Sequence, residues 1–181
     1  MAEKKGGIVK RGHEETLNMA VSLLEEFGLP LGLLSPLANV LEIGFVRATG
    51  YMWIVQQKKV EHDFNTINKI VSYNSEISAY LEKSRLKKLK GVTSKEMVPW
   101  PLVEKIWKDE GKIEIIGKLE GPEKWEEVLM WAPVSDIWVD DPPTGRIDIK
   151  SLRGTPKRFP VEAFYGNYQG EQTNNPPENY M

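Results

Sequence analysis

Short runs of aromatic and β-branched residues, separated by turn-forming residues, dominate the sequence from Glu42 to Phe64. Two such runs, "EIGFV" and "YMWIVQ", flank the turn chemistry of Ala48–Gly50, and "KKVEHDF" follows with alternating polarity. Aromatic and β-branched residues fit a pleated, half-buried surface, whereas glycine and small polar residues favour turns. Many such runs beside one good helix predict a mainly β fold, either a rolled sheet or a partly closed β-barrel.

A single amphipathic helix is expected near the N-terminus, over His13–Phe27. Its apolar residues recur at helical spacing, in the order Leu17, Ala20, Val21 and Leu24. Gly28 supplies a C-terminal stop, and Pro30 prevents the helix from continuing. The stretch "GLPLGLLSP" that follows suits neither a helix nor a strand. Because its leucines favour burial, we expect it to form a structured loop that plugs the core.

The length of 181 residues corresponds to one domain that is large enough for a real hydrophobic core. Residues 1–12 contain glycine and lysine without any periodic pattern, which predicts a flexible tail. Residues 165–181 are polar and contain Gly and Pro, which predicts a disordered tail. The single β-roll domain is therefore expected at 13–164.

Two neighbouring segments share one order of residues. The first reads "WPLVEKIWKDEGKIEI" from Trp100 to Ile115, and the second reads "WAPVSDIWVDDPPTGRIDI" from Trp131 to Ile149. Both contain tryptophan, valine, isoleucine, tryptophan, an acid, glycine and two isoleucines in that order. We interpret the pair as a tandem repeat, with copies at 95–125 and 126–159.

Each copy has the pattern of a β-hairpin. An incoming strand ends near Trp107 or Val139, acids and a glycine make the turn, and the returning strand alternates. In the second copy this alternation turns Ile147 and Ile149 inward. Because the apolar spacing before the turn is not strictly two, we expect a bulge or corner near Pro133. The chain therefore carries an extra, duplicated hairpin.

Composition excludes several classes of protein. The chain has no cysteine, which rules out disulfides, thiolate catalysis and cysteine-based zinc sites. The formal net charge of -2 gives no reason to expect a specific nucleic-acid partner. The N-terminal stretch "MAEKKGGIVKRGHEE" lacks the apolar core of a secretory signal, and no apolar run reaches membrane-spanning length. We therefore expect a cytoplasmic protein.

No catalytic or metal-binding constellation is visible, so we expect no enzyme, no catalytic residues, no metal and no cofactor. The two histidines, His13 and His62, lack metal-ligand spacing. Asp140 and Asp141 precede Pro-Pro and Thr-Gly, a context typical of a turn rather than of acid–base chemistry. Neither a G-x-S-x-G motif nor a P-loop is present. His62 is the one residue that we would test as a base or as a group that orients a ligand.

One basic cluster lies in "LEKSRLKKLKG" and contains Lys83, Arg85, Lys87 and Lys88. Such a cluster suits an anionic lipid head group or a phosphate. The leucines that alternate around it favour a simpler interpretation, in which a strand and a turn have a lysine-rich solvent face. We keep the cluster as the candidate contact for the anionic group of a ligand, or for a peripheral membrane surface.

The chain contains six tryptophans. Buried aromatic residues usually belong to the core, but a small rolled sheet lined by aromatic side chains also suits an apolar ligand. The candidate lining residues are Trp53, His62, Trp131 and Trp138.

The stretches "GLPLGLL", "VDDPPTG" and "FPVEAF", in this order, resemble the plant family known as domain of unknown function 538, also called smaller-with-variable-branches-like proteins. The resemblance runs from about Glu14 to Phe164 and includes "ATGYMWIVQQKKVEHDF" and "LKKLKGVTSKE". It implies a mainly β roll or barrel with an N-terminal helix, and it supplies no catalytic residues. It also implies one passage from "GV-x-x-KE" through a tryptophan hairpin to "DDPPTG", whereas this chain makes the passage twice.

Three functions remain open from the sequence. The first is a non-enzymatic plant protein that binds a hydrophobic or lipid-like small molecule in an apolar interior or groove. Kinship suggested between the family and lipid-binding defence proteins points the same way. The second is an interaction module of stress or growth signalling that docks partners on the edge of the extra hairpin. The third is a hydrolase, which ranks last because no nucleophile constellation is visible. We expect a monomer.

Overall fold

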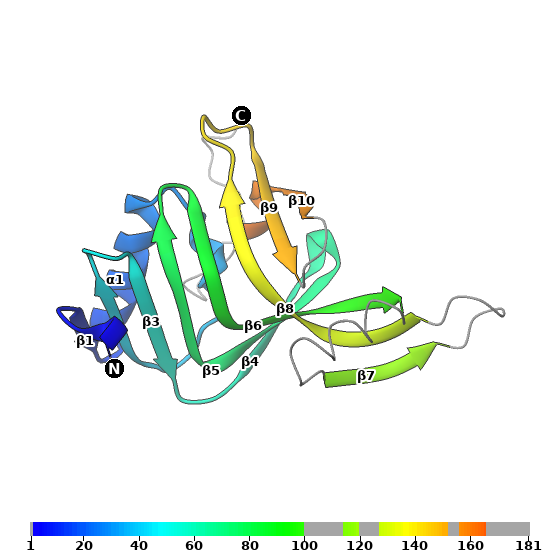
Figure 1. Ribbon diagram of the computed structural model, residues 1–181, viewed down its shortest axis with the longest axis horizontal. Coiled ribbons are helices and arrows are strands. Elements are labelled where there is room, and N and C mark those ends of the chain that lie inside the picture. The colour runs from blue at the N-terminus through cyan, green and yellow to red at the C-terminus, as the bar shows by residue number, and fades with distance from the viewer. Residues whose placement is uncertain (1, 100–113, 120–126, 152–155, 166–181) are drawn as a thin grey trace.

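The computed structural model describes residues 2–99, 114–119, 127–151 and 156–165 (Figure 1). The helix and strands are β1 (Ile8–Arg11), α1 (His13–Glu26), β2 (Val40–Val46), β3 (Tyr51–Gln56), β4 (Val60–Phe64), β5 (Lys69–Glu82), β6 (Arg85–Pro99), β7 (Glu114–Leu119), β8 (Glu127–Val139), β9 (Arg146–Ser151) and β10 (Lys157–Pro160). The described residues also form the short 3-10 turns η1 (Ala2–Lys4), η2 (Leu31–Leu33), η3 (Asn65–Ile67) and η4 (Val161–Phe164). The predicted C-terminal tail lies outside the described residues, apart from its first residue, Tyr165.

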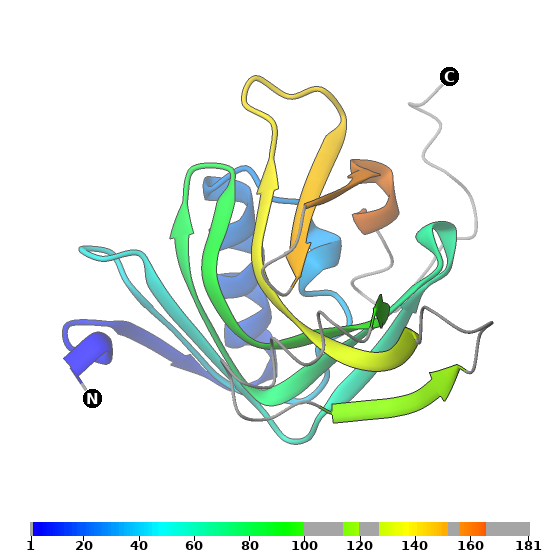
Figure 2. The same ribbon diagram turned by 45° about the vertical axis from the view of Figure 1, so that its right-hand side comes forward.

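The described strands form one antiparallel sheet. Its main path runs β1–β2–β3–β5–β6–β8–β9–β10, while β4 pairs with β5 and β7 pairs with β8. No pairing among the described residues joins β1 to β10, so the sheet is rolled and not closed into a barrel (Figure 2). The prediction of a mainly β fold with one N-terminal helix is confirmed. Of the two alternatives that the sequence left open, the rolled sheet is the one observed.

Helix α1 lies behind the strands in the view of Figure 1 and covers one face of the sheet. It begins at His13, as predicted, and Phe27 caps its C-terminal end. Leu23 and Leu24 turn toward the sheet and share the core with Phe45. Of the apolar residues that the sequence marks, Leu24 belongs to the core and Ala20 packs against it, so the packed face overlaps the predicted stripe only in part.

The predicted plug also forms. Turn η2 follows the helix. Leu29, two residues before it, and Leu33, its last residue, are both buried. The hydroxyl of Tyr73 in β5 donates a hydrogen bond of 2.9 Å to the carbonyl oxygen of Leu33. This bond satisfies a buried backbone acceptor that the irregular segment leaves without a partner of its own.

The N-terminal segment differs from the flexible tail that the sequence predicts for residues 1–12. Ile8–Arg11 form β1, which pairs with β2 through Ile8 opposite Phe45 and Arg11 opposite Glu42. The ammonium group of Lys4 lies 5.0 Å from the ring centre of Trp53. A four-residue strand has too few positions to show a period, so its local sequence does not reveal a pairing that depends on β2.

Strand β5 is continuous, although Asn74 and Ser75 have the composition of a break. Its ladder with β6 shifts between Tyr73 and Ser78. The buried side-chain amide of Gln56 donates hydrogen bonds to the carbonyl oxygens of Tyr73 (3.0 Å) and Asn74 (2.9 Å). Since these bonds replace ladder partners, the strand passes through an irregularity instead of ending.

The second repeat copy folds as the predicted hairpin. Strand β8 ends at Val139, and β9 returns with Ile147 fully buried and Ile149 packed against the core. The β8–β9 ladder shifts between Val134 and Asp136, immediately after Pro133, which confirms the expected bulge.

The first repeat copy is described only in part, because residues 100–113 and 120–126 lie outside the described residues. Its returning segment contributes β7, in which Ile115 pairs with Met130 of β8. The first half of β8 therefore has β6 on one side and β7 on the other. The duplication itself stays a prediction.

Candidate functional site

A small apolar cavity of about 50 Å³ lies between the inner face of the rolled sheet and the short turns that cover it. Phe64 and Phe164 meet over it, with ring centres 5.0 Å apart. Most of its lining is aliphatic or aromatic, and includes Leu33, Leu34, Met52, Ile67, Ile77, Leu86, Leu89, Val92, Val134 and Ile137. In the part of the chain that the structure describes, three charged side chains line it: Lys69, Glu96 and Lys157.

The carboxylate of Glu96 holds these charged groups together. One of its oxygens, Oε2, accepts hydrogen bonds from the ammonium groups of Lys157 (2.6 Å) and Lys69 (3.0 Å). The other, Oε1, accepts one from the hydroxyl of Ser94 (2.7 Å). The Glu96 residue is 7% exposed, and a carboxylate so placed needs such partners. We refer to Lys69, Ser94, Glu96 and Lys157 as the polar cluster.

Three strands bring the polar cluster together, of which β5 and β6 are neighbours in the sheet. Lys69 opens β5 directly after Asn68, whose positive φ of 56° turns the chain out of η3. Glu96 lies near the end of β6, and Lys157 begins β10. The cluster thus ties β5, β6 and β10 together at one end of the cavity.

The cluster shifts two pKa values. Burial by itself raises the pKa of Glu96, but the hydrogen bonds from Lys157, Ser94 and Lys69 together outweigh it, so this pKa lies below its usual value of 4.5. Burial lowers the pKa of Lys157, and the hydrogen bond and charge of Glu96 more than offset that effect, so this pKa is raised. Glu96 and Lys157 therefore carry their charges at neutral pH.

The lowered pKa of Glu96 predicts a loss of stability in acid. A group whose folded-state pKa is depressed contributes stability above its unfolded pKa, and this contribution disappears as the pH falls through the folded pKa. We therefore expect the free energy of unfolding to decline as the pH falls below 4.5, the usual pKa of a glutamate side chain. The variant Glu96→Gln should be less stable at neutral pH and should lose less stability on acidification. Urea titrations at a series of pH values test this, and an unchanged pH slope in the variant would contradict it.

A second, open hollow adjoins the polar cluster on its outer side. It has a volume of about 330 Å³ and lies where β5 begins and β6 runs on toward Pro99. Its walls are Asp63, Asn68, Lys69, Ile70, Lys95, Glu96, Met97, Leu129 and Lys157. Lys69, Glu96 and Lys157 line both this hollow, which we call the outer cleft, and the apolar cavity.

Trp53, the first predicted lining residue, lies on the other face of the sheet from the cavity. Its neighbours Met52 and Ile54 point into the core, so Trp53 points outward. There it is still only 3% exposed, and its indole NH donates a hydrogen bond of 2.7 Å to Glu42. The structure gives this tryptophan a packed position away from the cavity.

The other three predicted lining residues also lie outside the cavity lining. Trp131 is buried in β8, with the ammonium groups of Lys59 and Lys95 5.7 and 5.4 Å from its ring centre. Trp138 is half-buried under the guanidinium of Arg85. His62 is exposed, and its ring packs against Phe64 at 4.6 Å. The four candidates do not converge, and whether any of them binds a ligand stays a prediction.

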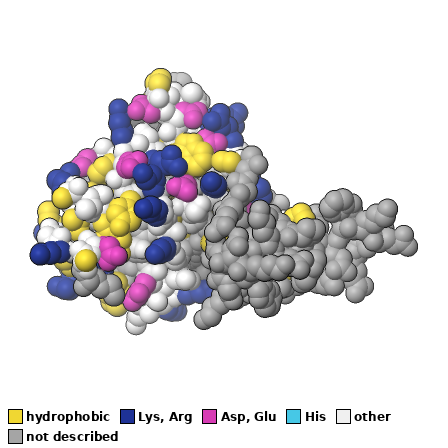
Figure 3. All heavy atoms as spheres, viewed as in Figure 1, with side chains coloured by type: hydrophobic (Ala, Val, Ile, Leu, Met, Phe, Trp, Pro, Cys, Tyr) yellow, Lys and Arg dark blue, Asp and Glu magenta, His cyan; other side chains and the backbone are white. Residues whose placement is uncertain are grey.

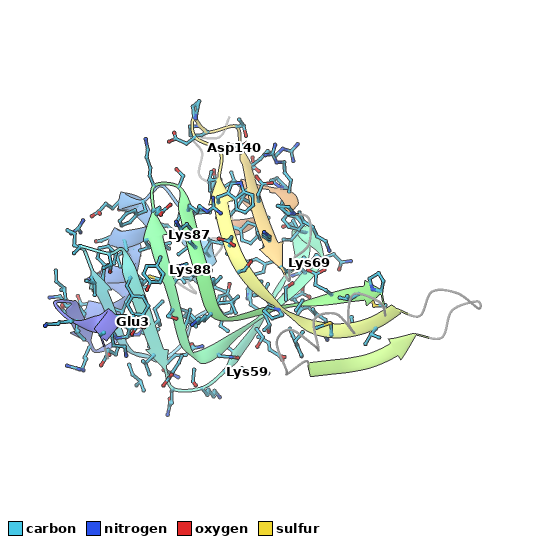
Figure 4. The ribbon with its side chains drawn as sticks, viewed as in Figure 1. Glu3, Lys59, Lys69, Lys87, Lys88 and Asp140 are labelled. Atoms are coloured by element: carbon cyan, nitrogen blue, oxygen red, sulfur yellow. The ribbon has the colours of Figure 1, made fainter. Side chains whose placement is uncertain are left out.

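The basic cluster of the sequence occupies the β5–β6 hairpin and lies away from Lys69 (Figure 4). Lys83 pairs with Asp141 at 3.1 Å, Arg85 with Asp136 at 3.4 Å and Lys87 with Glu82 at 2.6 Å, while Lys88 lies over the ring of Tyr80. On the face drawn in Figure 3, Lys and Arg side chains alternate with acidic ones. These four cations therefore have partners within the protein. This agrees with the simpler interpretation from the sequence, a strand and turn with a lysine-rich solvent face.

Asp140 and Asp141 lie in the turn between β8 and β9 (Figure 4). Asp140 accepts a hydrogen bond from the hydroxyl of Thr144 and pairs with Arg158 at 3.3 Å. These contacts support the turn interpretation. In the part of the chain that the structure describes, no group of three His, Cys, Asp or Glu side chains is placed to hold a metal ion.

The polar cluster has one signal in the sequence, which lies outside the motifs that predicted the site. In "GVTSKEMV" every second residue from Val92 to Val98 is buried, which puts Ser94 and Glu96 in the same inward row. A carboxylate in an inward row requires cationic or hydrogen-bonding partners. Its partners, Lys69 and Lys157, have no local signal, because only the folded sheet brings them to Glu96.

No described helix is both long and apolar enough to cross a membrane. No curated protein and no solved structure matches this chain. One family does match, and its description is "Protein of unknown function, DUF538". The match covers residues 20–120, which is more than half of the chain and includes the second half of α1, the plug, β2 to β7 and the polar-cluster residues Lys69, Ser94 and Glu96. The protein therefore belongs to the DUF538 family.

Proposed function

We propose that this protein binds a small hydrophobic or lipid-like molecule, whose apolar part enters the cavity inside the rolled sheet. One observation carries the proposal. The cavity has an apolar lining, and its charged groups are gathered at one end, where the outer cleft begins. Binding sites for amphiphilic molecules commonly combine a mostly apolar wall with a few polar groups that fix orientation. The setting of this proposal is the cytoplasm, as the N-terminal sequence leads us to expect, of a plant cell, as the family resemblance implies.

The cavity is small, so a ligand can enter it only if part of the protein moves. A volume of about 50 Å³ exceeds the roughly 10–15 Å³ needed for one water molecule but is well below the hundreds of Å³ typical of ligand pockets. A ligand tail longer than a few carbon atoms therefore has to displace part of the cover. The turns η3 and η4, with Ile67 and Phe164 on the lining, are the elements that we expect to move.

A pair of valine substitutions tests the cavity. Val134 lines it, whereas Val98, equally buried, does not. Filling the cavity with Val134→Leu should weaken binding of decanol or of the dye anilinonaphthalene sulfonate several-fold, and Val98→Leu should leave binding unchanged. Overpacking of this kind costs about 1–3 kcal/mol, so both proteins should still fold. Dye fluorescence and calorimetric titration measure the effect.

Equal affinities in the two valine variants would place the dye elsewhere on the protein. The intrinsic fluorescence of tryptophan is a less suitable reporter, because none of the described tryptophans lines the cavity. A change in dye emission that follows the Val134 substitution alone is the result that supports the proposal.

A second candidate function is protein docking on the edge of the sheet. Strand β1 ends the main path of the sheet and pairs with β2 alone among the described strands. Its Ile8 is 54% exposed, and Leu41 on β2 is 52% exposed. Exposed strand edges with apolar side chains support the addition of a partner strand. Flat titrations with apolar probes would leave this interaction module as the better candidate.

A further inference from the structure

We propose that the outer cleft is the site for an anionic head group, a carboxylate, which binds between Lys69 and Lys157 while the apolar tail of the same molecule enters the cavity. The inference rests on the proposed function and names the chemical class of the ligand. It comes from the charges around Glu96, from the hydrogen bonds that remain available there, and from the continuity of the cleft with the cavity.

The charges of the polar cluster do not balance. One carboxylate, that of Glu96, faces the two ammonium groups of Lys69 and Lys157. Among the described residues, the cleft is lined by three lysines, with Lys95 as the third, and by two acids, with Asp63 as the second. One further carboxylate, bound in the cleft, would equalise the charges both in the polar cluster and in the cleft.

The two lysines keep donors for such a guest. Each ammonium group has three N–H donors, and in the polar cluster each gives one to Oε2 of Glu96. The side chain of Lys157 is 52% exposed and that of Lys69 is 21% exposed, whereas Glu96 is almost wholly buried. The remaining N–H groups of the lysines are therefore the part of the cluster that a molecule in the cleft can reach. The buried carboxylate of Glu96 fixes the positions of both ammonium groups.

The polar cluster lies where the outer cleft meets the apolar cavity, so one ligand can place its head group in the cleft and its tail in the cavity. Lys69, Glu96 and Lys157 are walls of the cleft and of the cavity. A carboxylate that bridges the two lysines thus lies next to the entrance of the apolar lining. A head group fixed in this way orients a single chain toward Phe64 and Ile67, which lie on the lining beyond.

The wild-type protein gives the first test, by calorimetric titration with decanoate, decanol and decylamine. We expect decanoate to bind roughly tenfold or more tightly than decanol, because charge-assisted hydrogen bonds are the stronger ones, and decylamine to bind most weakly. Added salt should reduce this preference, since both lysines are partly exposed. Decanol binding equal to or tighter than that of decanoate would overturn the head-group site while leaving the cavity intact. Absence of binding for all three compounds would overturn the proposed function as well.

Substitutions in the cluster give the second test. The variant Lys157→Met should lower the affinity for decanoate about tenfold and leave that for decanol nearly unchanged, and Lys157→Arg should restore much of the loss. Glu96→Gln should act in the opposite direction and raise the affinity for decanoate, because it removes the competing carboxylate. Lys90→Met, on the exposed face of β6, is the control for the change in net charge.

The direction of the Glu96→Gln effect separates the proposal from a purely structural ion pair. If the cluster only stabilises the fold, Lys157→Met and Glu96→Gln will both lower the melting temperature and will change the affinities for decanoate and decanol in parallel. Parallel changes would overturn the head-group site. Opposite changes in decanoate affinity, with decanol as the constant reference, would support it even where the variants are less stable.

Discussion

Replacement of Gly91 by alanine is expected to destabilise the protein by roughly 3–5 kcal/mol, a large part of the 5–15 kcal/mol typical of a folded domain. Gly91 lies in β6 with a positive φ of 89°, which disfavours any side chain. An added Cβ would also overlap the carbonyl oxygen of Glu76 and would lie 3.1 Å from the Cα of Ile77. Because the obstacle is backbone, the strands β5 and β6 would have to separate where their ladder is already irregular.

Substitution of a second glycine, Gly12, distinguishes the cost of backbone strain from the cost of a steric clash. Gly12 has nearly the same φ, 90°, but an added Cβ there would have no atom within 4 Å. Gly12→Ala should therefore cost only the strain of the backbone, about 1–3 kcal/mol, and Gly91→Ala should cost clearly more. Urea denaturation followed by circular dichroism measures both. Equal losses would show that the close approach of β5 and β6 at Gly91 contributes nothing.

The sequence predicts those elements whose signals are local. The spacing from Leu17 to Leu24 defines α1, and the turn chemistry around Ala48–Gly50 separates β2 from β3. In the same way, the hairpin of β8 and β9 follows from the acids and glycine between Val139 and Arg146. Each of these patterns is complete within one short stretch of chain, so no knowledge of distant partners is needed.

Elements that depend on partners far away in the sequence are harder to predict. Ile8–Arg11 become a strand only because β2 offers a free edge. Asn74 has the composition of a turn, yet the strand continues because Gln56, far away in sequence, supplies hydrogen bonds to its carbonyl and to that of Tyr73. In both cases tertiary contacts override local propensity, which a local sequence pattern does not reveal.

In the candidate site, too, some features have a local signal in the sequence and others depend on distant partners. Alternation in β6 is sufficient to place Glu96 in an inward row, but the lysines that neutralise it lie on β5 and β10. For Trp53 the sequence correctly suggests burial. It does not reveal that the tryptophan is buried on the outer face, because the cover there comes from the unpredicted N-terminal strand and turn. Burial of an aromatic residue therefore does not identify the face on which it lies.

Replacement of Trp53 by alanine is expected to cost about 3–5 kcal/mol, as for other buried tryptophans. The indole lies so close over Gly44 of β2 that a Cβ at Gly44 would overlap it, and it also contacts Gly7 and the ammonium group of Lys4. Its loss leaves Glu42 without the indole hydrogen bond. The strand β1 should then detach first, which amide hydrogen exchange at Ile8–Arg11 detects.

Trp138 is the matched control for Trp53, because it too lies on a central strand beneath a cationic side chain, that of Arg85, but is only half-buried. Trp138→Ala should cost less than half as much, since less apolar surface loses its cover. It should also leave exchange in β1 unchanged. If Trp53→Ala abolished decanol binding while stability and β1 exchange stayed as in the wild type, Trp53 would act as a ligand contact and the packing role argued from the structure would be wrong. Loss of stability with intact decanol affinity in the folded fraction is the expected outcome, because the cavity and Trp53 lie on opposite faces of the sheet.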